Sequence, residues 1–283
     1  MKILVTGGKG QLGQELEGLV RDSGHDGDWI FASSQEADIT DREKLETFFE
    51  QVNPDIIVNC AAYTAVDKAE EDEEMAKAIN VDGVRNLAEL AKDKLIIHVS
   101  TDFVFDGTSH IAYKEDVATS PLGVYGQTKL DGEKALLETA KNAVVLRTSW
   151  LYGSYANNFM KTMLRLAETR SELNVVADQI GTPTYTGDLA KAIIQIVDRG
   201  GIPAGVYHFS NEGVTSWYGF AHSIFDLAGL KVKVKPIPSA QYPTPAQRPH
   251  FSVLDKTKIK LALGIEIPHW RDSLKEALRC TRY

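Results

Sequence analysis

The chain has 283 residues, of which 43% are hydrophobic and 25% are charged, as is usual for a globular protein. This length fits one large domain or two closely packed ones. The net charge of −8 argues against a general nucleic-acid-binding protein, because no basic excess is available to neutralise phosphates. The two cysteines, Cys60 and Cys280, are too few for a disulfide framework or a zinc site.

The start of the chain indicates where the protein works. It runs directly into an apolar strand rather than a signal peptide, and no apolar run approaches the length needed to cross a membrane. We therefore expect a cytoplasmic protein without membrane contact. In a reducing compartment Cys60, which ends an apolar strand, should be a buried and unreactive thiol.

Strands and helices alternate through the first half of the chain. Short apolar runs predict strands at residues 2–6, 29–32, 55–60, 95–100 and 143–147. Helical spacing of apolar residues predicts helices at about 12–20, 41–52, 72–92 and 125–140. This alternation indicates an α/β fold with a parallel sheet.

The second half is less regular. Its patterns predict helices at about 158–169, 186–197 and 216–228, and strands at 173–176 and 205–209. A proline-rich segment then follows, marked by Pro236, Pro238, Pro243, Pro245 and Pro249. Because proline cannot donate to a strand ladder, we expect an extended surface segment or a lid.

Three glycines between the first strand and the first helix predict a cofactor site. Gly7, Gly10 and Gly13 lack a Cβ, so backbone N–H groups can approach a pyrophosphate at the helix N-terminus. An ordinary tight turn would have a similar sequence. The strand before the glycines and the helix after them favour dinucleotide binding.

The end of the second predicted strand bears on the choice of cofactor. Residues 32–35 read Ala-Ser-Ser-Gln, with no acid to repel a 2′-phosphate and no arginine to require one. We expect NADPH to bind and NADH to be accepted as well. Asp38 and Ile39 follow and are placed to meet the adenine. Asp38 could instead cap a helix, as could Thr40 or Asp41.

A tyrosine and a lysine one helical turn apart indicate proton transfer. Tyr125 and Lys129 would share one face of a helix, and the lysine charge would lower the tyrosine pKa. A surface pair with no function is the alternative. Ser100, Thr101 and Asp102 follow a strand end, where ligands meet open α/β sheets. A hydroxyl there could bind a substrate carbonyl or simply cap a turn.

An acidic run spans residues 67–74. Acids near a helix start complement the helix dipole, so a solvated helix start explains this run. A metal site is the alternative.

Together these motifs carry a family resemblance. They are Gly7-Gly8-Lys9-Gly10-Gln11-Leu12-Gly13, Asn59-Cys60-Ala61-Ala62-Tyr63-Thr64, Ser100-Thr101-Asp102-Phe103-Val104-Phe105-Asp106-Gly107, Tyr125-Gly126-Gln127-Thr128-Lys129, Arg147-Thr148-Ser149-Trp150, Asp178-Gln179-Ile180-Gly181-Thr182-Pro183-Thr184 and Arg248-Pro249. The chain resembles the extended short-chain dehydrogenases/reductases over nearly its whole length. Within them it is similar to the dTDP-4-dehydrorhamnose reductases.

The resemblance implies a Rossmann-type doubly wound parallel sheet with a smaller, mostly C-terminal substrate-binding domain. Residues 1–150 would form the dinucleotide-binding domain, rejoined by about 173–197. Residues 151–283 would mainly bind the sugar nucleotide. The protein would be a monomer or a homodimer.

The resemblance also implies roles for individual residues. Tyr125 would be the proton donor, Lys129 would hold the nicotinamide ribose, and Thr101 would tune the tyrosine and orient the sugar. The implied cofactor-binding residues also include Gly7, Gly10, Gln11, Leu12, Asp38, Ile39, Ala61, Ala62 and Tyr63. Asp102 and Trp150 would contact the sugar nucleotide.

Arg248 is a further candidate, for the diphosphate of the sugar nucleotide, because a guanidinium pairs with phosphate in a bidentate way. A surface salt bridge remains open for it. Glu15 could match one ligand of a magnesium ion that some members bind between subunits. The other ligands cannot be placed, so we predict no metal.

The implied activity is reduction of the C4 keto group of dTDP-4-dehydro-L-rhamnose to dTDP-L-rhamnose, a precursor of surface polysaccharides. Related dehydratases carry a second carboxylate where Phe103 follows Asp102 here, which argues against dehydration. Two alternatives stay open. One is a reductase of another 4-keto sugar nucleotide, and the other is a non-catalytic regulatory subunit resembling that of methionine adenosyltransferase.

Overall fold

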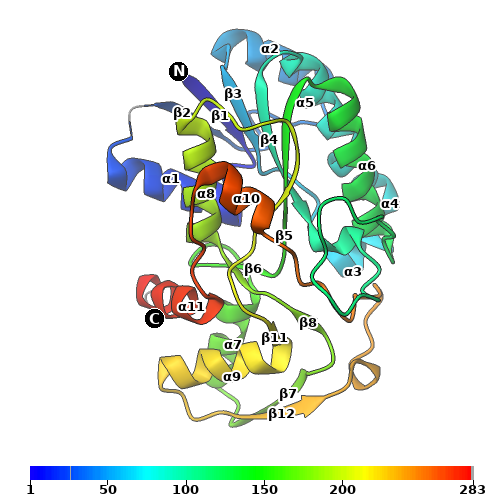
Figure 1. Cartoon of the computed structure of the whole chain (residues 1–283), viewed down its shortest axis with the longest axis vertical. Coiled ribbons are helices and arrows are strands. Elements are labelled where there is room, and N and C mark those ends of the chain that lie inside the picture. The colour runs from blue at the N-terminus through cyan, green and yellow to red at the C-terminus, as the bar shows by residue number, and fades with distance from the viewer. Residues whose placement is uncertain (26, 282–283) are drawn as a thin grey trace.

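A computed structural model describes residues 1–25 and 27–281. Its centre is a six-stranded parallel sheet with the strand order β10-β5-β4-β3-β1-β2 (Figure 1). The strands are β1 (Lys2–Thr6), β2 (Asp28–Ala32), β3 (Ile56–Asn59), β4 (Leu95–Thr101), β5 (Asn142–Thr148) and β10 (Gly205–His208). The predicted α/β fold with a parallel sheet is confirmed. The direction of winding reverses between β1 and β3, and ligands bind at such switch points.

Helices cover both faces of this sheet (Figure 1). One face carries α1 (Gln11–Ser23), α8 (Thr186–Asp198) and α10 (Thr257–Leu263). The other carries α2 (Arg42–Val52), α5 (Gly83–Ala91) and α6 (Val124–Thr139). Along β1, Ile3 and Val5 belong to the first core and Leu4 to the second. Burial on both faces explains why the strands are apolar throughout.

The long helix predicted at 72–92 is interrupted. It consists of α4 (Glu73–Lys77), a π-helical turn at Ala78–Asp82, and α5. The backbone of Gly132 on α6 lies against the Asn80 carbonyl, where a Cβ would collide. The Asn80 side chain accepts a hydrogen bond from the Tyr63 N–H at 2.9 Å and donates one to Thr128 Oγ1 at 3.1 Å. The π-turn therefore joins α6 to the loop after β3.

A second core lies below the sheet in Figure 1. Its helices are α7 (Phe159–Ala167), α9 (Trp217–Ala228) and α11 (Trp270–Cys280). The short paired strands nearby are β7 (Glu172–Val176) with β12 (Lys233–Ile237), β6 (Leu151–Tyr152) with β9 (Thr184–Tyr185), and β8 (Ile180–Gly181) with β11 (Thr215–Ser216). Thus β7 belongs with this second core, whereas α8 and β10 return to the large sheet.

The C-terminal part differs from the sequence-based prediction. The prediction did not include helices α10 and α11, although Trp270, Leu274, Ala277 and Leu278 of α11 recur at helical spacing. The proline-rich segment begins as a strand, since Pro236 lies within β12. A two-stranded sheet has only edge strands, which tolerate a residue without an N–H. Within the described ranges no helix is long and apolar enough to cross a membrane.

Candidate active site

The glycine turn after β1 is tightly packed. Gly7 has a φ of +70°, and a Cβ on it would lie 2.6 Å from the Ala61 backbone nitrogen. A Cβ on Gly13 would lie 2.5 Å from the Gly7 oxygen. Gly10 is the N-cap of α1 and offers no side chain to its free N–H groups. The turn therefore leaves a helix N-terminus open to an anion at the switch point of the sheet.

An acid does approach the end of β2, although residues 32–35 contain none. Glu36 Oε2 accepts hydrogen bonds from Ser33 N at 2.9 Å and from Ser33 Oγ at 2.7 Å. These two bonds hold the pKa of the Glu36 carboxyl below its usual value. The donors that Ser33 could offer to a ribose phosphate are thus already bound by a neighbouring carboxylate.

The next turn explains the residues expected near the adenine. Asp38 Oδ1 accepts bonds from the N–H and hydroxyl of Thr40 at 2.9 and 2.7 Å. Ile39 is only 3% exposed and packs in the core, so its backbone alone could border a ligand. Asp41, rather than Asp38, caps α2 through Lys44 N. Of the candidates left open by the sequence, Asp41 is therefore the helix cap.

Tyr125 lies in the first turn of α6, beside the end of β4. The side chain is half-buried, and its ring meets the Phe103 ring edge-to-face at 5.5 Å. Burial raises the pKa of Tyr125 to about 12, while a hydrogen bond with Thr101 acts in the opposite direction and the Asp102 charge adds to the rise. The phenol therefore keeps its proton at neutral pH.

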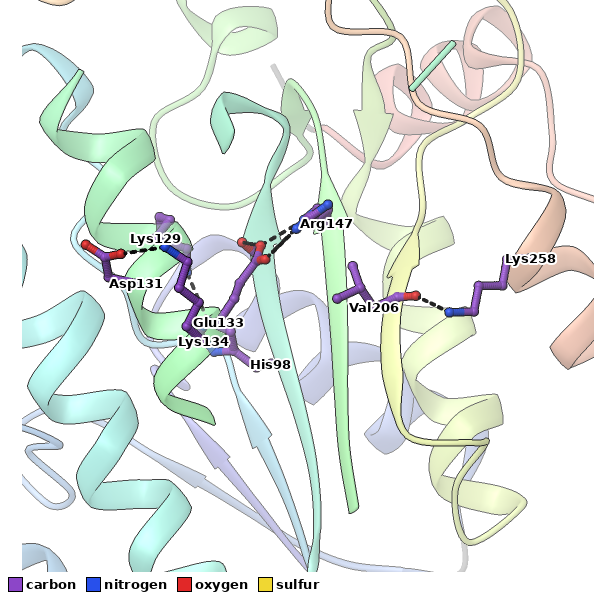
Figure 2. Close-up of polar contacts among 9 residues, drawn as sticks. His98, Lys129, Asp131, Glu133, Lys134, Arg147, Val206 and Lys258 are labelled. Atoms are coloured by element: carbon purple, nitrogen blue, oxygen red, sulfur yellow. Dashed lines mark hydrogen bonds and ion pairs between the residues drawn. The ribbon is translucent and has the colours of Figure 1, made fainter. Parts of the chain in front are cut away.

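Lys129 is almost fully buried, with 2% exposure. Its Nζ donates to the Val99 carbonyl at 2.7 Å and lies 3.4 Å from His98 Nε2 (Figure 2). Burial lowers the pKa of Lys129 to about 8. The prediction that Lys129 lowers the pKa of Tyr125 is wrong for this arrangement, because the ammonium contacts β4 and burial of the phenol dominates.

A buried ion pair fixes the helix that carries both residues. Arg147 Nε and Nη2 donate to Glu133 at 3.0 and 2.7 Å (Figure 2), and their side chains are 5% and 2% exposed. The Ser100 hydroxyl also donates to Glu133. Removing one partner of such a pair costs about 3–5 kcal/mol. Sequence reasoning missed this pair, although a charge at the end of an apolar strand (residues 143–147) was the available signal.

The residues expected to meet a sugar nucleotide lie together beyond β4. Asp102 is 2% exposed, and burial raises the pKa of its carboxyl to about 6. Trp150 has a φ of +47° and stacks on Trp217 with ring centroids 3.7 Å apart. Gly181 packs against both the Trp150 ring and the Ser252 hydroxyl, and Ser252 lies close enough to Asp102 to act against the rise of its pKa. The structure thus connects Asp102 with Trp150 through two small residues.

Arg248 forms a salt bridge, which is the alternative that the sequence left open. Its Nη1 and Nη2 donate to Asp67 Oδ1 and Oδ2 at 2.9 and 2.8 Å. This pairing holds the Asp67 carboxyl pKa below its usual value. The guanidinium therefore ties the proline-rich segment to α3 (Val66–Ala69). A diphosphate would have to displace Asp67 or share the guanidinium with it.

The other acids of interest also have protein partners. In the acidic run, Asp72 caps α4 and Glu70 accepts a bond from Val124 N. Glu15 Oε2 accepts a hydrogen bond from Thr186 Oγ1 at 2.7 Å, and burial raises the pKa of its carboxyl. Across residues 1–25 and 27–281, no three His, Cys, Asp or Glu side chains are grouped to hold a metal ion.

Cys60 lies beside Lys129, behind the glycine turn. Its thiol is free, and burial raises its pKa to about 12. A thiol that resists ionisation is a poor nucleophile. This fits the unreactive cysteine expected from the sequence.

Comparison with known proteins identifies the relatives of this arrangement. The family model described as the RmlD substrate binding domain matches residues 1–282. The dTDP-4-dehydrorhamnose reductase of Aggregatibacter actinomycetemcomitans is 44% identical over 286 residues, which cover 97% of each chain. The dTDP-4-keto-6-deoxy-D-glucose reductase of Streptomyces niveus is 39% identical, covering 97% of this chain and 95% of the relative.

A solved structure is also similar to this chain over nearly its whole length. The crystal structure of dTDP-4-dehydrorhamnose reductase from Bacillus anthracis in complex with NADP matches with a TM-score of 0.94 and 36% identity. The match covers 99% of both chains. The similarity therefore includes both the sheet and the second core.

Proposed function

Because the chain belongs to the RmlD substrate binding domain family, we propose that it is a dTDP-4-dehydrorhamnose reductase. It reduces the C4 keto group of dTDP-4-dehydro-L-rhamnose with NADPH or NADH and forms dTDP-L-rhamnose. The observation that carries this proposal is the placement of Tyr125 and Thr101. Both hydroxyls lie at the carboxyl end of β4, on the same edge of the sheet as the glycine turn.

The glycine turn fits a dinucleotide. Gly7 and Gly13 let the turn fold tightly, because a Cβ on either would collide with neighbouring backbone, and the open N-terminus of α1 suits a pyrophosphate. The residues that would hold the cofactor are Gly7, Gly10, Gln11, Leu12, Asp38, Ala61, Ala62, Tyr63, Tyr125 and Lys129, with the backbone of Ile39. When bound, the nicotinamide supplies the hydride.

Tyr125 supplies the proton. Its high pKa keeps the phenol protonated, ready to protonate the alkoxide that forms at C4. Tyr125 donates a hydrogen bond to the carbonyl oxygen, and Thr101, whose hydroxyl donates to Asp102 Oδ1 at 3.2 Å in the structure, would turn to donate a second. That oxygen gains negative charge only as the reaction proceeds, so fixed donors stabilise the transition state more than the ground state.

The second core supplies the sugar-nucleotide side. Asp102 and Trp150 would contact the sugar, and Arg248 would approach the diphosphate from the proline-rich segment. Residues 1–150, with the later elements α8, β10 and α10, would form the cofactor-binding part. The remaining C-terminal residues would form the substrate-binding part. The protein would act in the cytoplasm as a monomer or a homodimer.

Reduction of a different 4-keto sugar nucleotide is the second candidate, favoured by the similarity to the Streptomyces niveus enzyme. A regulatory subunit without activity is the third. The deciding assay follows NADPH oxidation with enzymatically generated dTDP-4-dehydro-L-rhamnose, and a parallel reaction offers dTDP-4-keto-6-deoxy-D-glucose. Rapid oxidation with the first substrate supports the proposal. Oxidation with the second substrate alone favours the second candidate, and no oxidation with either contradicts a reductase.

A further inference from the structure

A chain of buried hydrogen bonds runs beneath the glycine turn to Lys129. Asn59, at the end of β3, is 1% exposed, and His98, within β4, has no exposed surface. Asn59 Oδ1 accepts from Thr6 Oγ1 at 2.7 Å and from the Ala61 N–H at 3.0 Å. Asn59 Nδ2 lies 2.9 Å from His98 Nδ1. His98 Nε2 in turn lies 3.4 Å from Lys129 Nζ.

The Ala61 end of this series of hydrogen bonds determines which atoms donate and which accept. A backbone N–H can only donate, so the Ala61 N–H fixes which end of the Asn59 amide is oxygen. The other end, Nδ2, is then a donor, and His98 Nδ1 must accept from it. A neutral imidazole that accepts at Nδ1 carries its proton on Nε2. His98 therefore points an N–H group at the Lys129 nitrogen.

An N–H group facing Lys129 favours the neutral amine form of the lysine. A neutral amine can accept from His98 Nε2–H while it donates to the Val99 carbonyl, which is 2.7 Å away. An ammonium has no lone pair and would present hydrogen to hydrogen at His98. We infer that His98 is a positioning residue that holds the Lys129 nitrogen and makes its proton easier to release.

One charged group near Lys129 acts in the opposite direction. Glu133 on α6 favours the ammonium, but it is already paired with Arg147 of β5. Cys60 after β3 stays a neutral thiol, because burial raises its pKa to about 12. Burial and the Lys129 charge lower the pKa of His98 well below its ordinary value, which agrees with a neutral imidazole. Burial also lowers the pKa of Lys129. The contact with His98 thus acts on the Lys129 pKa in the same direction as burial does.

The functional meaning of this contact rests on the proposed reduction. Each turnover consumes the Tyr125 proton, and a lysine that releases its proton readily can help to restore it. His98 would then set the pH range of turnover without touching substrate or cofactor. The contact itself can be measured in the protein alone, so its failure is distinguishable from failure of the proposed activity.

Nitrogen NMR of the histidine side chains, without cofactor, is the first test. We expect His98 to carry its proton on Nε2 and to stay neutral from pH 5 to 9. A proton on Nδ1, or an imidazolium within this range, would overturn the inference. The assignment comes from the signal missing in H98Q.

The second test titrates Lys129 through its ¹³Cε and ¹⁵Nζ signals, assigned with K129M. In H98Q the side-chain oxygen can turn to accept from the ammonium, so we expect the Lys129 midpoint to rise by about one pH unit. H222Q is the matched control, because His222 is exposed on α9. Equal midpoints in H98Q, H222Q and the unmodified protein would contradict the inference.

A further variant guards against misfolding of H98Q. In N59D the carboxylate can only accept, so His98 must place a proton on Nδ1 and present a lone pair to Lys129 if it stays neutral. We expect the NMR signature of His98 to change tautomer and the Lys129 midpoint to rise. If the proton stays on Nε2 alone in N59D, Asn59 does not set the tautomer and the inference fails.

Discussion

The Glu70 carboxylate accepts a hydrogen bond from the backbone N–H of Val124 at 2.9 Å, and so anchors the first turn of α6. The N-cap of this helix is Gly123, which has no side chain to do so. Tyr125 is the next residue along the helix. Asp67, three residues before Glu70, binds Arg248. One acidic segment therefore holds both the helix of the proposed proton donor and the proline-rich segment.

E70A tests this anchoring role. Loss of a helix cap typically costs about 1 kcal/mol, so we expect a free energy of unfolding lower by about that amount. The first turn of α6 should also loosen, which lowers kcat because the Tyr125 hydroxyl is less well placed. Urea unfolding and the reductase assay provide the measurements. E71A, which changes the exposed neighbouring acid, is the control and should leave both values unchanged.

Y125F tests the proton donor. The ring contact with Phe103 survives, so cofactor affinity should stay near normal, while kcat should fall by roughly 10²–10⁴, the usual contribution of a positioned general acid. Fluorescence titration with NADPH and the reductase assay separate these effects. Y218F, on α9, is the matched change outside the site. Full turnover by Y125F would remove Tyr125 from the role of acid.

The sequence predicted the parts of this site that depend on local patterns. The glycine turn, the helix of Tyr125 and the parallel strands follow from spacing and composition. The partners of Lys129 and Arg248 did not, because those contacts join segments far apart in the chain. Arg248 and Asp67 are separated by 181 residues, and either could have met many other charged groups.

Burial also raises the pKa of Tyr125, which Lys129 was expected to lower. Helical spacing places Lys129 near Tyr125, but spacing does not show where the Nζ points. The polar groups on β4, His98 and the Val99 carbonyl, attract it instead. Polar residues inside apolar strands, such as His98 in residues 95–100, were the available sign of a buried network.

D102N tests how much the buried Asp102 carboxyl lowers the free energy of unfolding near neutral pH. The carboxyl pKa of Asp102 in the folded protein is about 6, above its ordinary value of 3.8. The folded protein therefore holds this proton more tightly than the unfolded chain, and stability is lost as the pH rises from about 4 to 6. A shift of this size corresponds to about 3 kcal/mol.

We accordingly expect D102N to raise the free energy of unfolding by up to about 3 kcal/mol at pH 7.5 and to change it little at pH 4. Urea unfolding at the two pH values measures the difference. D116N, at an exposed aspartate, is the control. Equal effects of D102N at both pH values would contradict a raised Asp102 pKa. Weaker sugar-nucleotide binding by D102N would explain why the costly acid is kept.

Variants of the Arg248–Asp67 pair distinguish between two roles for the arginine. If Arg248 only fixes the proline-rich segment, R248A and D67A should raise KM for the sugar nucleotide equally, and the double variant should be no worse than either. If Arg248 also binds the diphosphate, R248A should raise KM more than D67A does. Steady-state kinetics of the three variants decide between these outcomes. E71A again serves as the control.

Cofactor preference depends on the turn after β2. Residues 32–35 contain no acid and no arginine, so both NADPH and NADH should support turnover. Discrimination should be at most about 100-fold, or about 2.7 kcal/mol. We expect NADPH to be preferred, because the Ser34 hydroxyl, and that of Ser33 once Glu36 moves away from it, can bind a phosphate. The measurement is kcat/KM for the two cofactors at one fixed sugar concentration.

Glu36 is the residue that could reverse this preference. Its carboxylate is bound to the N–H and hydroxyl of Ser33 and would have to move before a 2′-phosphate could use them. E36Q removes the charge but retains an oxygen that can accept these bonds, so kcat/KM should rise for NADPH relative to NADH. E17Q, at the exposed partner of Lys9 on α1, controls for the loss of one acid. A preference for NADH above 100-fold in the unmodified protein, abolished in E36Q, would show that Glu36 binds the ribose hydroxyl and that residues 32–35 do not decide the cofactor.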